Sequence, residues 1–342
     1  MGCYAEATFI HIRVSMIQYY SNQNGVVSVS DTKPADCAKI FWYDILNPTK
    51  EDEALVEAEL GIDLPTREEM QELEVSARLY SEADQLFVIA SFPVEQAEDD
   101  YSNVNITFVV AKNYIVTMRY TLTKVITPFA ARLVKKSAPS AQELLLSMME
   151  AFVAAYADML EKKTARLDGI GRTIFTEPHA AKTKSLNSFS VRNWRSMLQN
   201  IGMIGQILAV IREGLVSFSR MATFLHGQTH HVSLDKDATI RLATIERDST
   251  HLSEHASYLS NKVSFLLDST LGMINVEQNQ IIKLFSVVSV VLMPPTLVAS
   301  IYGMNFKWMP ELDWHFGYPF AVTGMVLSAI LPFVYFKLKK WF

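Results

Sequence analysis

Apolar residues are distributed unevenly along the chain, and the longest uncharged run lies near its C-terminus. Residues 284–306, LFSVVSVVLMPPTLVASIYGMNF, contain no charged side chain over about 23 positions. At a rise of about 1.5 Å per residue, this length crosses the hydrocarbon core of a bilayer. The run therefore predicts a transmembrane helix. A second uncharged run at residues 318–336 predicts a second span.

One face of the first span is not uniformly apolar. Steps of three and four residues from Asn279 pick out side chains that are mostly small or polar. This polar row consists of Asn279, Ile282, Ser286, Ser289, Met293, Thr296, Ser300 and Gly303. In a membrane, such a row is typical either of helix packing or of a face in contact with water. The pattern alone leaves both interpretations open.

The first span is the end of a much longer predicted helix. Between Asp237 and Tyr302 there is no proline before Pro294. A continuous helix of about 65 residues would be about 100 Å long, so only its last third fits a bilayer. We expect the rest to form a stalk, the geometry of a gating lever. Pro294-Pro295 is expected to loosen the backbone hydrogen bonds beside Thr296.

The chain before the stalk has the mixed pattern of an α/β domain. β-branched and aromatic residues predict strands at 40–43, 85–92, 104–111 and 114–120. A hairpin is predicted at Lys112-Asn113. One helix is expected to follow Pro48 and end at Gly61, and another to begin near Thr66. Further helical patterns cover 139–172, 186–224 and the stalk from residue 237.

Composition and charge narrow the class of protein. Of 342 residues, 49% are hydrophobic, and this excess is concentrated in the last sixth of the chain. The net charge of −5 provides no basic field for nucleic acid, so nucleic acid is not an expected partner. Cys3 and Cys37 are too few for a disulfide framework and suit a reducing cytosol.

Two further classes are disfavoured by what the sequence does not contain. Residues 1–20 do not have the pattern of a signal peptide, so we expect the bulk of the protein to stay on the side where it is made. The chain has no glycine-rich phosphate loop and no nucleophile elbow. We therefore expect no enzymatic activity, no catalytic residues and no bound cofactor.

The end of the first span carries a family motif. Tyr302-Gly303-Met304-Asn305, followed by Met309-Pro310-Glu311-Leu312, resembles the YGMN signature and MPEL loop of the CorA family of divalent-cation channels. Stretches at 42–48, 61–70 and 74–80 resemble the cytoplasmic domain of that family. The C-terminal KLKKWF resembles its basic tail. The resemblance covers about residues 37–342, and the first thirty or so residues resemble nothing in it.

We therefore expect an α+β membrane protein with a cytoplasmic α/β domain, a long stalk helix and two transmembrane helices per subunit. The resemblance implies a homopentameric funnel, since nothing in the sequence itself counts subunits. The expected parts are a disordered N-terminal arm at 1–36, the α/β domain at 37–136, a helical region and stalk at 137–283, spans at 284–306 and 318–336, an external loop at 307–317 and a basic tail at 337–342. By the positive-inside rule, Lys283 and the lysines after residue 336 place both termini in the cytoplasm, beneath the cell inner membrane.

The resemblance implies a channel for divalent cations, with Mg²⁺ the first expectation and Co²⁺ or Ni²⁺ as further permeants. Mg²⁺ gives up its water reluctantly, so neutral oxygens suit the hydrated ion. The implied selectivity site is formed by Tyr302, Gly303, Met304 and Asn305, with the Asn305 amide as the outer site. The row from Asn279 to Ser300 would line the pore, with Met293 in a hydrophobic constriction. Glu311 and Asp313 would attract cations to the external loop.

Three departures from the family pattern keep alternatives open. Lys307 stands where many relatives have an acid, residues 171–232 are basic where relatives are often acidic, and Ile282 stands where some have methionine. The first two motivate a Zn²⁺ transporter of the same architecture as the alternative. A third class is a membrane-anchored structural or signalling protein that has lost transport.

Regulatory cation sites cannot be mapped by resemblance, so only candidates are named. These are Glu246, Asp248, Glu254 and Asp268 on the stalk, and Glu95, Glu98, Asp99 and Asp100 in a loop. His251-Leu252-Ser253-Glu254-His255 fits an H-x-x-E-H pattern, which places two histidines on one helix face. A regulatory transition-metal site and an ordinary helix surface are both compatible with this pattern.

Overall fold

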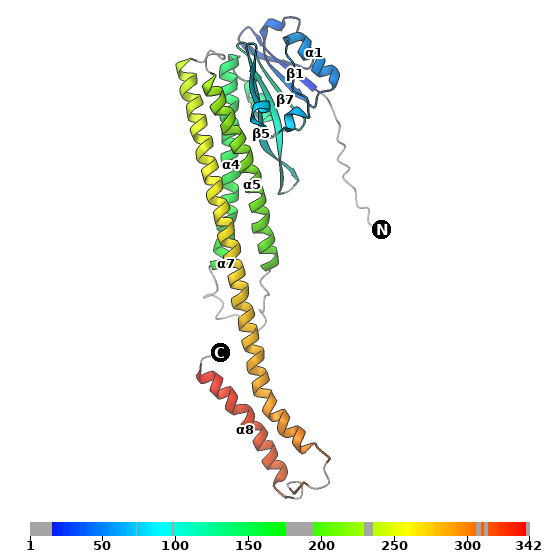
Figure 1. Cartoon of the computed structure of the whole chain (residues 1–342), viewed down its shortest axis with the longest axis vertical. Coiled ribbons are helices and arrows are strands. Elements are labelled where there is room, and N and C mark those ends of the chain that lie inside the picture. The colour runs from blue at the N-terminus through cyan, green and yellow to red at the C-terminus, as the bar shows by residue number, and fades with distance from the viewer. Residues whose placement is uncertain are drawn as a thin grey trace. The chain divides into compact units, whose positions relative to one another are not determined.

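The structure is a computed structural model that describes residues 16–72, 74–97, 99–175, 194–228, 235–305, 309–310 and 314–339. The chain divides into two compact units. Unit 1 comprises residues 1–188 and 195–266, and unit 2 comprises residues 189–194 and 267–342. Helix α7 (Lys236–Tyr302) is continuous through this division (Figure 1). Each unit is described separately below.

Unit 1 contains a seven-stranded sheet in the order β2-β1-β3-β7-β6-β5-β4. The strands are β1 (Met16–Gln23), β2 (Val26–Ser30), β3 (Ile40–Leu46), β4 (Leu79–Glu82), β5 (Gln85–Ala97), β6 (Asp100–Val110) and β7 (Ile115–Arg119). β3 and β7 pair in parallel, and every other neighbouring pair is antiparallel. The predicted hairpin at Lys112-Asn113 is confirmed by the antiparallel β6–β7 ladder.

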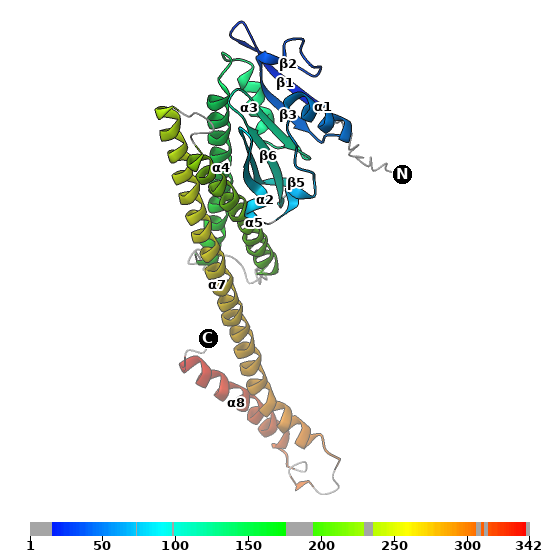
Figure 2. The same cartoon turned by 45° about the horizontal axis from the view of Figure 1, so that its top comes forward.

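Helices cover both faces of this sheet (Figure 2). On one face, Val56 of α1 (Lys50–Leu60) joins a core with Tyr43, Phe87 and Met118 from the strands. On the other face, Trp42 meets Phe129 of α3 (Ile126–Leu133) with ring centroids 6.1 Å apart. Aromatic rings continue this second core, with Phe92 against Phe152 of α4 (Ala141–Phe175) and Phe152 against Phe218 of α5 (Trp194–Gly227). These contacts give unit 1 its α/β layers.

Local sequence explains the limits of α1. Thr49 accepts a hydrogen bond from the Asp52 backbone N–H, and the Asp52 carboxylate accepts one from the Thr49 N–H, which completes a capping box. Gly61 ends the helix with a φ of +67°, a conformation that favours glycine. Both predicted ends of this helix are therefore confirmed.

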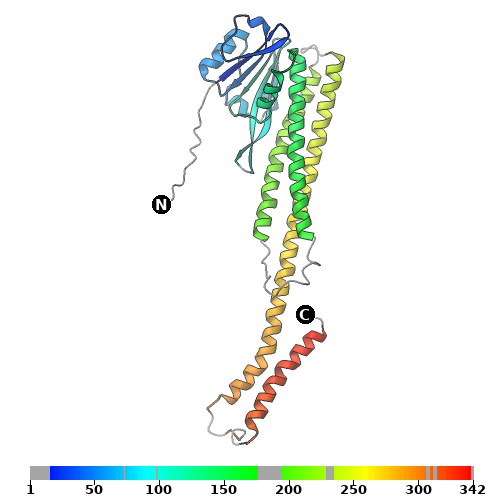
Figure 3. The same ribbon diagram turned by 180° about the vertical axis from the view of Figure 1, so that it is seen from behind.

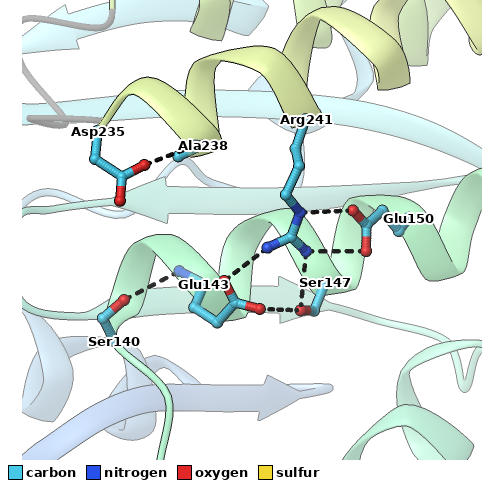
Figure 4. A network of polar contacts seen from close by, with 7 residues as sticks. All are labelled: Ser140, Glu143, Ser147, Glu150, Asp235, Ala238 and Arg241. Carbon is cyan, nitrogen blue, oxygen red and sulfur yellow. Dashed lines mark hydrogen bonds and ion pairs between the residues drawn. The ribbon is translucent and has the colours of Figure 1, made fainter.

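The stalk part of α7 packs against α4 and α5 within unit 1 (Figures 1 and 3). Figure 4 shows the contact nearest its N-terminus, where the Arg241 guanidinium bridges two carboxylates of α4. The Nε of Arg241 donates to Glu150 at 2.9 Å, and its Nη1 donates to Glu143 at 2.7 Å. Asp235 caps the same helix end by accepting from the Ala238 backbone N–H at 2.7 Å. These contacts fix the first turns of α7 on unit 1.

Unit 2 contains the C-terminal part of α7 and helix α8 (Gly317–Leu338), which runs back beside it (Figures 1 and 3). The buried and half-buried positions of α8 share one side of the helix, and five of them are glycine, alanine or serine: Gly317, Ala321, Gly324, Met325, Ser328, Ala329, Pro332 and Phe336. Small residues allow two helix backbones to approach closely in a membrane. The second span was predicted at 318–336, and the helix extends one or two residues beyond it at each end.

Three expectations differ from the structure. The disordered arm expected at 1–36 was wrong for residues 16–30, which form β1 and β2 around a turn at Asn24-Gly25; residues 1–15 lie outside the described part. The helix expected near Thr66 is only a 3₁₀ turn, η2 (Glu69–Gln71), because the chain becomes extended at Glu72. The first span was expected to reach residue 306, but the helix ends at Tyr302.

Candidate ion pathway along helix α7

The polar row predicted on the first span forms one continuous exposed face of α7. Asn279, Ser286, Ser289, Thr296 and Ser300 are all exposed in the single chain. Its two apolar members are exposed as well, with Ile282 at 61% and Met293 at 68%. A row this open makes no packing seam inside the subunit. Within the described chain, it is available to water, lipid or another subunit.

The covered face of the same helix lies opposite this row. Val287 is only 3% exposed, and Val291, Pro294, Val298 and Tyr302 are half-buried. These residues fall at helical spacing. Val287, Val291, Pro294 and Val298 each precede a member of the row by two positions, which is about 200° of rotation around the helix. The subunit thus covers part of the side of α7 that lies opposite the row, while the row and apolar neighbours such as Phe285, Leu292 and Leu297 stay exposed.

Two prolines interrupt the backbone hydrogen bonds in the middle of this segment. Pro294 and Pro295 lie inside α7 and have no N–H, so the carbonyls of Val290 and Val291 lose their usual helical partners. Thr296 follows directly, and its hydroxyl donates to the Leu292 carbonyl at 2.8 Å. Its oxygen remains able to accept from a water molecule. The helix nevertheless continues past this point to Tyr302.

The motif residues lie at the point where α7 ends. The Gly303 N–H donates to the Ala299 carbonyl at 2.9 Å, and the Met304 N–H donates to the Ile301 carbonyl at 3.3 Å. A Cβ added at Gly303 would lie 3.2 Å from the Ala299 oxygen, so a larger residue would crowd the last turn. Asn305 is exposed and outside the helix. The structure places its amide just beyond the end of the polar row.

The predicted external-loop residues Glu311 and Asp313 lie outside the described residues, as does Lys307. His315 is described and exposed, and its ring contacts Phe316 at a centroid distance of 5.7 Å. The electrostatic contribution of the loop therefore stays a prediction.

Three helices in the described chain are long and apolar enough to cross a membrane: α5, α7 and α8. In α5, 44% of the apolar window is buried inside the protein, whereas only 6% is buried in each of α7 and α8. Ile204, Leu208 and Phe218 are among the α5 residues that pack in the soluble core. The apolar surface of α5 is thus largely used by unit 1, and α7 and α8 are the helices with apolar surface left for lipid.

The candidate regulatory residues of the stalk do not converge. Asp248, His251, Glu254, His255 and Asp268 are all exposed on α7. The His251 Nδ1 lies 3.5 Å from a Glu254 carboxylate oxygen, while the ring of His255 lies against Tyr258. Among the described residues, no group of three or more histidine, cysteine or acidic side chains is placed to hold a metal ion. The H-x-x-E-H pattern is therefore not assembled into a metal centre within the described part of one subunit.

Of the four acids expected in one loop, Glu95 lies in β5 and Asp100 begins β6, and two of the four have cationic partners. Asp99 accepts from Arg166 at 2.5 Å and from Lys163 at 3.1 Å, and these hydrogen bonds lower the pKa of its carboxyl group. Glu95 pairs with Lys124 at 2.6 Å. Asp100 is exposed, and Glu98 lies outside the described residues. A carboxylate that already has cationic partners is a poor ligand for a second cation.

One contact near the pathway was not predicted. In unit 2, the indole N–H of Trp194 donates to the carboxylate of Glu277. Glu277 precedes Asn279 by two positions and therefore points away from the polar row. The only signal in the sequence is an acid at the start of a hydrophobic segment, which does not identify its partner.

Comparisons with known proteins agree on one family. The family described as CorA-like Mg²⁺ transporter protein matches residues 38–339. The chain is 34% identical over 330 residues to the magnesium transport protein CorA of Escherichia coli K12, covering 96% of this chain and 99% of that one. It is 36% identical over 307 residues to the protein of the same name from Salmonella typhimurium, covering 88% and 91%.

Solved structures show the same fold. The complete structure of the CorA magnesium transporter from Methanocaldococcus jannaschii matches with a TM-score of 0.75 at 16% identity, over 96% of this chain and 99% of that one. The structure of the full-length CmaX protein matches with a TM-score of 0.65 at 14% identity, over 96% and 98%.

Proposed function

The chain belongs to the CorA-like Mg²⁺ transporter family, and we propose that it conducts Mg²⁺ across a membrane along the polar row of α7. The observation that carries this proposal is the exposed row from Asn279 to Ser300, set opposite the covered face of the same helix and continued by Asn305. The two curated relatives described above are both named as magnesium transport proteins. Such a function accords with the expectation that the protein is not an enzyme.

Neutral oxygens suit the chemistry of this cation. Mg²⁺ holds its water tightly and is usually bound with several waters retained. The side-chain oxygens of Asn305, Thr296 and Ser289 accept hydrogen bonds from such waters without a charged cage. A site of this kind recognises the hydrated ion at Tyr302, Gly303, Met304 and Asn305, with Asn305 as the outer selectivity residue.

Closure of the pathway would involve the two apolar members of the row. Ile282 and Met293 are separated by three turns and are highly exposed in the single chain. Rings of such side chains, one from each subunit, form a hydrophobic constriction that loses its water when it narrows. The remaining pore-lining residues, Asn279, Ser286 and Ser300, keep the rest of the path polar.

The resemblance to the CorA family supports the assembly, and the lysines at the ends of the spans support the orientation. We propose a homopentamer embedded in a lipid bilayer, in which five copies of α7 surround one axis. Lys283 precedes the first span, and Lys337 and Lys339 end the second. By the positive-inside rule, both termini are cytoplasmic and the membrane is the cell inner membrane. The external loop expected at 307–317 and the basic tail expected at 337–342 belong to this proposal.

Entry of Mg²⁺ would be driven by the membrane potential. Each elementary charge gains about 2.3 kcal/mol per 100 mV, so a divalent cation gains about twice that. No further energy source is needed for inward movement.

Asp248, Glu254 and Asp268, with His251 and His255, are exposed on the stalk. They remain proposed regulatory ligands, for which a second subunit would have to supply the other ligands.

Ion flux through the purified full-length protein in liposomes tests this function. We expect Mg²⁺ influx that rises with inside-negative potential, with Co²⁺ and Ni²⁺ as further permeants. Asn305→Ala should reduce Mg²⁺ flux about tenfold or more, because the hydrated ion loses its hydrogen bonds at the outer site. Thr323→Ala is the matched control, since the Thr323 hydroxyl bonds the Pro319 carbonyl of its own helix.

The outcomes separate the alternatives. Flux of Zn²⁺ alone would retire the Mg²⁺ assignment in favour of a Zn²⁺ transporter of the same architecture. Mg²⁺ flux that Asn305→Ala leaves unchanged would refute the role of the amide. No flux of any divalent cation from correctly assembled protein would support the membrane anchor that has lost transport.

A further inference from the structure

A crevice of about 270 Å³ opens in unit 1 between helix α5 and the edge of the sheet at β4 and β5. Glu213, Ser217 and Arg220 line it from α5. They are spaced four and three residues apart, so they share one face of the helix. Arg78 and Ser91 line the opposite wall. No residue of the proposed ion pathway takes part.

Arg78 is held at this crevice by neutral groups. Its Nε donates to the Glu72 backbone carbonyl at 2.5 Å, and its Nη1 donates to the Ser91 hydroxyl at 3.1 Å. Arg78 is half-buried and makes no ion pair with any described residue. Its Nη2 has no hydrogen-bond partner within the described part of the chain. The guanidinium is thus fixed in place, and its charge is not neutralised by direct contact.

Arg220 brings a second guanidinium to the same space. It is exposed on α5 and, among the residues that the structure describes, forms neither an ion pair nor a hydrogen bond. Burial lowers the pKa of Arg78, Glu213 opposes this effect, and the nearby charge of Arg220 lowers the pKa further. The two positive charges in this small crevice repel each other, and an anion bound between them would offset this electrostatic repulsion.

The other polar groups complete a set of donors with one acceptor. The Ser217 oxygen accepts from the Ser91 backbone N–H at 3.0 Å, which leaves the Ser217 O–H free to donate. Glu213 accepts from the Asn103 side-chain amide at 3.1 Å and does not pair with either arginine. Counting Arg78 and Arg220 against Glu213, the crevice carries a charge of +2 − 1 = +1.

We propose that this crevice binds a small phosphate ester that carries hydroxyl groups. The two guanidinium groups present planar forks of N–H donors, which match the oxygens of a phosphate, and the Ser217 hydroxyl adds another donor. Glu213 accepts from a ligand hydroxyl and repels a second anionic group, so a single phosphate is favoured over a polyanion. Val216 and Leu79 supply apolar wall for a short carbon chain.

Binding to the purified full-length protein tests this site. Calorimetric titration in magnesium-free buffer would use glycerol phosphate and inorganic phosphate as probes, with sodium chloride at equal ionic strength as the blank. Arg220→Gln should weaken glycerol phosphate binding about tenfold or more, because one charge-assisted contact is lost. Arg212→Gln is the matched control, since Arg212 is also exposed on α5 but does not line the crevice.

Every outcome bears on the proposal. Tighter binding of glycerol phosphate than of inorganic phosphate, lost in Arg220→Gln and kept in Arg212→Gln, supports an ester site. Equal affinity for the two probes with the same variant pattern overturns the ester and leaves a site for inorganic phosphate. The site is overturned if glycerol phosphate shows no saturable binding up to about 10 mM, which is tenfold above a dissociation constant of about 1 mM for a weak ligand. It is also overturned if both variants bind with equal affinity. Because Arg220 makes no contact that the fold needs, loss of folding does not confuse this test.

Discussion

Labelling of introduced cysteines provides the most direct test of the proposed ion pathway. The only native cysteines, Cys3 and Cys37, can be replaced by serine to give a background without thiols. Single cysteines would then be placed at Ser289 and Thr296 in the polar row, and at the positions directly after them, Val290 and Leu297. All four side chains are exposed in the single chain, at 44% for Val290 and 61% for Leu297.

The members of each pair differ in direction by about 100° around the helix. If the row faces a water-filled axis, the cysteine in the row meets water and its neighbour meets lipid or a helix seam. A water-soluble thiol reagent reacts with the thiolate, whose pKa of about 8.5 rises in apolar surroundings. Each unit of pKa lowers the thiolate fraction about tenfold near neutral pH. We therefore expect Ser289→Cys and Thr296→Cys to react at least about tenfold faster than Val290→Cys and Leu297→Cys.

The rates would be measured in intact membranes with a charged methanethiosulfonate reagent, with free thiols counted afterwards in denaturant. Mg²⁺ present during labelling should slow the reaction at the two row positions and leave the other pair unchanged. Equal rates within both pairs would refute the reasoning. That result would mean that lipid or dry protein surrounds α7 uniformly, as expected for a plain membrane anchor.

Two further predictions concern the soluble unit. Asp44→Asn removes the ionised partner of Arg119, whose side chain is only 3% exposed, and should lower the free energy of unfolding by about 3–5 kcal/mol. The midpoint temperature of thermal unfolding of the full-length protein should therefore fall by several degrees. Asp36→Asn, at an exposed ion pair, is the control and should leave this temperature unchanged. Asp99 has a pKa lowered below 3.8 by its ion pairs, so its contribution to stability is present above that pH and is lost as the pH falls through the folded-state pKa. Asp99→Asn should therefore flatten the acid limb of a stability-against-pH curve, and Asp100→Asn should not; identical acid limbs in the wild type and Asp99→Asn would contradict this.

Local signals were sufficient for the elements whose stability is decided locally. The two ends of α1, the β6–β7 hairpin and the two long apolar helices were all predicted from short patterns. The β1–β2 hairpin was missed, although the sequence contains its signal. Asn24-Gly25 is a typical hairpin turn, and in the structure it lies between two strands with positive φ angles of 56° and 88°. The resemblance to the CorA family covers only residues 37–342, so the residues before it were expected to form a disordered arm.

Long-range contacts could not be predicted in this way. Asp44 and Arg119 are 75 residues apart and meet only because β3 and β7 pair in parallel, with Asp44 opposite Thr117. Asp99 was named as a possible metal ligand because its charge is visible in the sequence. Its two cationic partners on α4 are not visible there. A sequence shows which side chains are charged, while the fold decides which charges are already neutralised.

The partners of the polar row are likewise not visible in the sequence of one subunit. A helix face with hydroxyl and amide groups is costly in lipid, where each unsatisfied polar group loses its hydrogen bonds to water. Helix α8 is the other apolar helix of unit 2, and the covered face of α7 with Val287 and Val298 lies opposite the row. Two helices cannot enclose an aqueous path, since they leave most directions around that path open. Other copies of α7 would close the remaining directions and present Ser289 and Thr296 to a common axis. Conduction is therefore expected to require assembly, and conditions that separate the subunits in detergent should abolish Mg²⁺ flux on reconstitution while leaving the folded α/β layers of unit 1 intact.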